Sequence, residues 1–240
     1  MYADWRKTTS LILLLAAAVT YAGVPWEALV GFPLDPARSY LSELAAVDQP
    51  TSPLFRMLDG LTGALILCAL FLGRQKPRVR GTRSASAFTF AAFACLTLLD
   101  AASPMACATS ASAQCAAADA ANTLGTTHQV HTLSSSAALI AVLLSAILLA
   151  ISVTRDRAPA RLLERWLVLG GVGALTAVTI IVSVLAVRSM ADGQLLDGGG
   201  YAQRAQVLLV SAYIAGFGII SARSRTHLLG TSPATIRNAS

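Results

Sequence analysis

The sequence predicts an all-α protein, a polytopic transmembrane bundle of six helices with both termini in the cytoplasm and a short external cap helix. Hydrophobic residues make up 55% of the 240-residue chain and charged residues 12%, whereas about a quarter of a soluble chain is charged. The mean hydropathy is +0.63. Apolar segments recur along the chain, and the basic residues gather on one side of them. A water-soluble domain, a disordered chain and a nucleic-acid-binding domain are disfavoured, despite a net charge of +6.

Six segments are long and apolar enough to cross the ~30 Å hydrocarbon core of a bilayer. They cover residues 10–30, 54–73, 84–103, 131–153, 166–187 and 203–221. The apolar runs are continuous rather than alternating, which argues against the strands of an outer-membrane barrel. We expect residues 1–225 to form one transmembrane domain and residues 226–240 a flexible cytoplasmic tail. A cleaved signal peptide is the alternative for the first segment and would leave five spans.

The orientation follows from Lys and Arg, because short cytoplasmic loops retain positive charge. With six spans, one side of the membrane receives both termini and two loops, which hold fourteen of the eighteen basic residues. The other side holds Arg38, Arg56, Arg188 and Arg204 with nine of the twelve acidic residues. We therefore expect cytoplasmic termini. The abundance of Ala, and of Arg over Lys, is typical of a bacterium with a GC-rich genome. With the six spans, we therefore expect a multi-pass protein of a bacterial plasma membrane.

The four cysteines divide into two pairs by position. Cys107 and Cys115 lie in the external connection between the third and fourth spans, where thiols oxidise, so we expect a disulfide. A zinc site is the alternative, although a separation of eight residues is not one of the tight metal spacings. Cys68 and Cys95 lie in the middle of spans and are expected to be packing residues.

The external cap helix is predicted in the connection between the first two spans. Tyr40, Leu41 and Leu44 recur at near-helical spacing, Ser39 is the expected N-cap, and Glu43 falls in the first turn. A helix of this kind can lie flat with its apolar face on lipid.

A candidate polar site combines this region with the start of the fourth span. His128 and His131 share one helical face, while Asp59 opens the second span and Asp100 closes the third. One interpretation is a zinc site with both histidines and one aspartate as ligands, a bound water as nucleophile and Glu43 or the second aspartate as general base. The other is that these groups hydrogen-bond helix ends together.

Glycines supply two further expectations. Gly170 with Ala174, and Gly173 with Ala177, give the fifth span a small-residue face, which we expect to pack inside the bundle. The run from Gly198 to Gly200 predicts a flexible external turn. The sequence contains no nucleotide-binding glycine motif. The spans also lack a charge at their centres, and this absence argues against an ion-coupled carrier.

Four short motifs suggest a family by their order along the chain. They are the Ser-Tyr-Leu-Ser-Glu-Leu segment at 39–44, Phe55-Arg56 with Asp59, the stretch from Asp100 to Pro104, and the segment from His128 to Ser135. Together they resemble the bacterial integral-membrane family catalogued as domain of unknown function 998 (DUF998), over most of the chain. The resemblance implies a six-helix membrane bundle without an established activity.

The chain is more loosely similar to membrane hydrolases of the alkaline ceramidase and adiponectin-receptor type, in which Ser, Asp and three His surround zinc. This similarity implies a catalytic role for Ser135, with His128, His131 and Asp59 or Asp100 around the metal. The sequence lacks the paired histidines on the last helix and the seventh span of those enzymes.

These observations leave two hypotheses for function. The first is a membrane component that binds a membrane lipid or a partner, such as another membrane protein or a second copy of the chain, through an outward-facing polar pocket. The alternative is a zinc-dependent hydrolase acting on a lipid amide or ester at the outer leaflet. No nucleic-acid partner is expected.

Overall fold

The computed structural model describes residues 2–73, 81–155, 162–192 and 198–223. Within them the chain forms eight α-helices and one 3-10 helix, without strands, so the all-α prediction is confirmed. The elements are α1 (Tyr2–Tyr21), α2 (Val24–Leu29), η1 (Leu41–Ala45), α3 (Ser52–Gly73), α4 (Thr82–Ala102), α5 (Ala113–Ala120), α6 (Thr126–Arg155), α7 (Leu162–Asp192) and α8 (Gly199–Arg223). The expected tail at 226–240 lies outside the described residues.

Five helices of the described chain are long and apolar enough to cross a membrane: α3, α4, α6, α7 and α8. Helix α1 has 20 residues, but its first turns carry Asp4, Arg6 and Lys7. The five helices indicate a multi-pass membrane protein.

The first expected segment, 10–30, is not one continuous helix. Helix α1 ends at Tyr21, and Gly23 takes a positive φ of 63° before α2 begins at Val24. A glycine tolerates this left-handed backbone, and the Leu41 side chain occupies the space where a Cβ would project. Pro25 then fits the first turn of α2, where no helical N–H is needed. The chain therefore turns here, out of the bundle and over its end.

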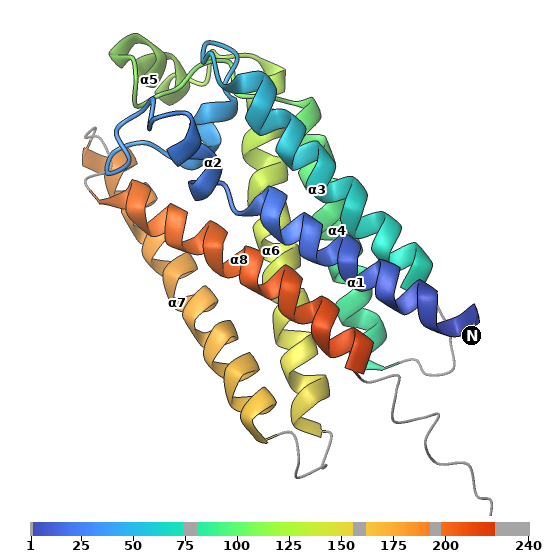
Figure 1. Ribbon diagram of the computed structural model, residues 1–240. Coiled ribbons are helices and arrows are strands. Elements are labelled where there is room, and N and C mark those ends of the chain that lie inside the picture. Colours follow the sequence, from blue (N-terminus) through green and yellow to red (C-terminus); the bar gives the residue numbers. More distant parts are fainter. Residues whose placement is uncertain (1, 74–80, 156–161, 193–197, 224–240) are drawn as a thin grey trace, which may run out of the picture.

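The six long helices contact one another in the cyclic order α1, α3, α4, α6, α7, α8 and back to α1. Aromatic side chains of α4 and α8 pack across the middle of this ring. The rings of Phe90 and Phe217 have centroids 4.6 Å apart, and Tyr213 meets Phe90 edge-to-face at 5.6 Å. The start of α1 and the end of α8 lie at the same end of the bundle (Figure 1).

The opposite end carries a layer that we call the cap, formed by residues 22–51 and 103–125, with α2, η1 and α5 (Figure 1). The short helix η1 begins after Tyr40 rather than Ser39. Its residues Leu41 and Leu44 are buried against Phe55 of α3. The apolar face of η1 therefore packs on protein, and η1 is not an interfacial helix that lies on lipid.

Two packing expectations are wrong. Cys68 and Cys95 are exposed on the outer surface of the bundle and do not serve as packing residues. A Cβ added at Gly170 or Gly173 would meet nothing within 4 Å, so the small-residue face of α7 does not pack inside the bundle. Helix α7 is the least buried of the five apolar helices, and its contacts with its neighbours α6 and α8 are the sparsest in the ring.

Candidate functional site

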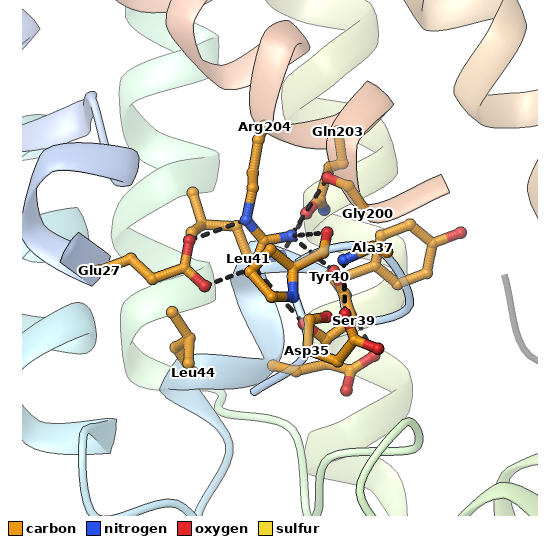
Figure 2. Close-up of polar contacts among 12 residues, drawn as sticks. Glu27, Asp35, Ala37, Ser39, Tyr40, Leu41, Leu44, Gly200, Gln203 and Arg204 are labelled. Carbon is orange, nitrogen blue, oxygen red and sulfur yellow. Dashed lines mark hydrogen bonds and ion pairs between the residues drawn. The ribbon is translucent and has the colours of Figure 1, made fainter. Parts of the chain in front are cut away.

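The cap is joined to α8 by a buried ion pair between Glu27 of α2 and Arg204 (Figure 2). Arg204 Nε donates to Glu27 Oε2 at 2.7 Å, and Nη2 donates to Oε1 at 2.5 Å. The remaining donors reach the carbonyl oxygens of Pro36, Ser39 and Gly200. Glu27 is 0% exposed and Arg204 5%. Both charges are thus compensated, as burial requires, which indicates that the pair fixes the cap in place.

Gly200 allows this approach. Its N–H donates to Ala37 O at 3.1 Å, and a Cβ at this position would overlap the carbonyl oxygens of Pro36 and Ser39. Gly199 and Gly200 are buried and form the first turn of α8. The expected turn is therefore confined to Gly198, which has a positive φ of 79°, whereas Gly199 and Gly200 are helical and buried.

Glu43 connects the two segments of the cap. Its carboxylate accepts from the Ser110 N–H at 3.1 Å, from Thr109 Oγ1 at 3.3 Å and from the Ser110 hydroxyl. Glu43 is 1% exposed. Burial raises the pKa of Tyr40 to about 12, and the Glu43 carboxylate adds to the shift. A buried carboxylate that accepts this many hydrogen bonds is suited to holding the segment around Ser110 in place. The role of Glu43 as a general base stays a prediction.

The expected disulfide is present, between Cys107 and Cys115. It closes a small loop that leads into α5. Asp48 anchors the same loop by accepting from the Ala108 N–H at 3.0 Å. The loop is therefore tied covalently within itself and by hydrogen bonds to the first cap segment.

A second polar cluster lies beneath the cap, between α4 and α6. Ser135 Oγ donates to Asp100 Oδ2 at 2.5 Å, and the Ser134 hydroxyl donates to Asp100 Oδ1. His131 Nδ1 lies 3.1 Å from Ser103 O and its Nε2 3.4 Å from Ser135 Oγ. Nδ1 therefore carries a proton for the carbonyl, and Nε2 faces the Ser135 hydroxyl.

His128 contacts different groups. Its Nδ1 accepts from the Ala106 N–H at 3.3 Å, so Nε2 carries the proton and donates to Asp119 at 3.0 Å. Asp59 lies near enough to Asp100 for their charges to interact. Within the described residues, no three His, Cys, Asp or Glu side chains are grouped so as to hold a metal ion. The zinc site and a catalytic Ser135 stay predictions.

A pocket of about 540 Å³ lies between α6, α7 and α8, away from both polar clusters. Most of its lining is aliphatic or aromatic, which suits an apolar ligand. The lining includes Ala146, Leu149, Leu163, Leu167, Val168, Val172, Leu175, Leu209, Ala212, Tyr213, Phe217, Ile219 and Ile220. Gly171 and Gly216 also line it, and a Cβ on either would meet nothing within 4 Å. The missing side chains of these two glycines leave the space open.

The pocket has charged residues at one end. Glu164, in the first turn of α7, and Arg223, the last residue of α8, both belong to its lining. Glu164 Oε1 is buried, as are Nε and Nη2 of Arg165, and none of the three atoms has a hydrogen-bond partner among the described residues. The sequence alone does not single out these residues, because charged residues near the ends of membrane spans are common and do not by themselves indicate a site.

Comparison with known proteins identifies a family. The family model described as protein of unknown function (DUF998) matches residues 14–220. No curated protein and no solved structure matches the chain. The family resemblance of the four motifs is therefore confirmed, whereas the looser similarity to zinc hydrolases finds no support in these comparisons. The chain belongs to the DUF998 family of proteins of unknown function.

Proposed function

We propose that this protein is a membrane component that binds the apolar chain of a membrane lipid in the pocket between α6, α7 and α8. The observation that carries the proposal is the pocket itself. Its volume of about 540 Å³ falls within the range of about 300–1,000 Å³ that is usual for small-molecule sites. Its walls come from three helices that are apolar enough to span a membrane.

The surroundings of the pocket favour a lipid over a water-soluble ligand. Helix α7 exposes large apolar side chains along its length, among them Leu163, Trp166, Ile180 and Val187. Such a surface is stable in a hydrocarbon medium and unfavourable in water. A lipid chain leaving that medium reaches the pocket without crossing water.

The proposal includes the topology of the whole chain. Helix α1 acts as a sixth span, because it fills the place between α3 and α8 that closes the ring. The end of the bundle that holds the start of α1 and the end of α8 faces the cytoplasm of a bacterium, in accordance with the basic residues. The cap then faces the oxidising side, in accordance with the Cys107–Cys115 disulfide.

The zinc-hydrolase alternative has no structural observation of its own in its favour. Both ring nitrogens of His128 are engaged by Asp119 and Ala106, and Asp100 is engaged by two serine hydroxyls. A zinc ion at these residues would have to displace these hydrogen bonds.

Native mass spectrometry of the detergent-purified protein tests lipid binding. Gly171→Leu places a side chain in the pocket, and Gly170→Leu is the matched control, because Gly170 is also open but does not line the pocket. We expect wild type and Gly170→Leu to retain bound phospholipid and Gly171→Leu to lose it at an unchanged melting temperature. Equal lipid retention by the three proteins would contradict the proposal.

A further inference from the structure

We infer that the lipid in this pocket is a phospholipid whose head group carries a primary ammonium, as in phosphatidylethanolamine. This inference rests on the proposed function and adds the chemistry of the head group. In this arrangement the ammonium binds Glu164 and the phosphate lies against Arg165 and Arg223.

The acceptor is Glu164 Oε1. This atom belongs to a residue that lines the largely apolar pocket, is buried, and has no hydrogen-bond partner among the described residues. A buried acceptor without a partner is unfavourable, and more so when it is charged. A ligand that brings an N–H donor to this oxygen removes that cost, and a positively charged donor removes most of it.

The donors are two guanidinium groups: that of Arg223, which lines the pocket, and that of Arg165, which follows Glu164 on α7 and is not itself part of the lining. Arg165 follows Glu164 in the first turn of α7, and its Nε and Nη2 are also buried without a partner within the described chain. Arg223 lines the pocket from the end of α8. These two side chains offer N–H donors to a phosphate, whose geometry guanidinium groups match well.

One head group satisfies both signs of charge. A phosphoethanolamine head carries a phosphate next to a primary ammonium with three N–H donors. A choline head has no N–H to donate to Glu164, and a glycerol head has no positive charge. Glu164 has a buried acceptor without a partner, and the adjacent Arg165 has two buried donors without a partner among the described residues. Together they favour a head group with a primary ammonium over a choline or a glycerol head group.

The direction of the pocket agrees with an amphiphile. Glu164 and Arg223 lie at helix ends, while Leu175 and Leu209 line the pocket within the spans. A phospholipid is arranged in the same way, with its polar head group at the membrane boundary and its apolar chain within the bilayer.

The test measures binding of dioleoyl phosphatidylethanolamine, phosphatidylcholine and phosphatidylglycerol, in equal amounts, to the purified full-length protein by native mass spectrometry. Because a hydrogen bond to a charged group contributes about 1.5–3 kcal/mol, wild type should prefer the ethanolamine lipid by about 10-fold or more. Glu164→Gln should abolish this preference and leave phosphatidylcholine binding unchanged. Arg165→Gln should weaken both lipids. Arg188→Gln, an exposed arginine at the far end of α7, is the matched control and should change neither.

The outcomes separate this inference from the proposed function. Equal binding of the three lipids by wild type, or a preference that survives Glu164→Gln, would overturn the head-group assignment. If Gly171→Leu still removes all three lipids, lipid binding in the pocket stands. Lipid binding that Gly171→Leu does not affect would overturn both. Melting temperatures show whether each variant is folded, and Glu164→Asp, which keeps the carboxylate, should restore part of the preference.

Discussion

At the scale of single residues, the Glu27–Arg204 ion pair is the contact that holds the cap on the bundle. The two residues are 177 positions apart in the chain, and all the groups around them are hydrogen-bonded. The sequence alone indicates only that Arg204 lies near the edge of a span, where a charge can reach water. In the structure the cap covers Arg204, and no local pattern predicts its distant partner.

Replacing Arg204 should therefore damage the fold far more than replacing an exposed arginine. Arg204→Gln leaves Glu27 buried without its cation, for which we expect a loss of about 3–5 kcal/mol in the free energy of unfolding. Arg188→Gln, at an exposed position, should change it by less than about 0.5 kcal/mol. Denaturant unfolding in detergent measures both, and equal stabilities would show that the ion pair is not structural.

Gly63 is a second residue whose role depends on packing. A Cβ at Gly63 of α3 would lie 2.7 Å from Ala94 O and from Leu98 Cγ of α4, whereas one at Gly60 would lie 3.7 Å from its nearest neighbour, Ala101 Cβ. Gly63→Ala should destabilise the protein by about 1–3 kcal/mol through overpacking.

Gly60→Ala supplies the control on the same helix. It should be neutral or stabilising by up to about 1 kcal/mol, because alanine favours the helix. If the two substitutions had the same effect on the melting temperature, close contact between α3 and α4 at Gly63 would be disproved.

At the scale of elements, hydropathy predicts the apolar helices well, because a membrane span needs only length and apolar composition. It does not predict how each helix is used. The first segment breaks at Gly23, where a positive φ depends on packing against Leu41. The small-residue stripe of α7 faces outward, because its place depends on how α6 and α8 pack. The outer polar residues were predicted to gather, but their pairing follows from the folded cap.

The loop that leads into α5 allows a prediction about the disulfide. By the chain-entropy model, a bond that closes so short a loop contributes about 2–3 kcal/mol. The Cys107→Ser/Cys115→Ser double variant should therefore lower the melting temperature and open the cap loop to proteolysis.

The matched control is Cys68→Ser/Cys95→Ser, which changes two exposed cysteines that form no disulfide in the described structure. It should leave both the melting temperature and the proteolysis pattern unchanged. A cap loop that stays protected in the first variant would mean that hydrogen bonds of Glu43 and Asp48 suffice to hold it.

At the scale of the whole molecule, the chain has two different ends and one open side. The cap end is closed by an ion pair, a disulfide and hydrogen-bonded carboxylates, which together leave few polar groups available for a ligand. The open side lies between α6, α7 and α8, where α7 contacts the ring least and two glycines leave a pocket. The hydrogen-bonded cap and the space in the bundle therefore support the proposal that a lipid binds within the membrane rather than at its outer surface.

Photolabelling tests this central claim most directly. A phosphatidylethanolamine with a diazirine midway along one acyl chain is irradiated with the protein in membranes, and the labelled peptides are mapped. The account predicts saturable labelling of α7 and α8 around Leu175 and Phe217, which unlabelled lipid competes away and Gly171→Leu abolishes, while Gly170→Leu does not. Labelling spread evenly over outward-facing residues such as Phe71 and Phe88, unaffected by competitor and by Gly171→Leu, would contradict it.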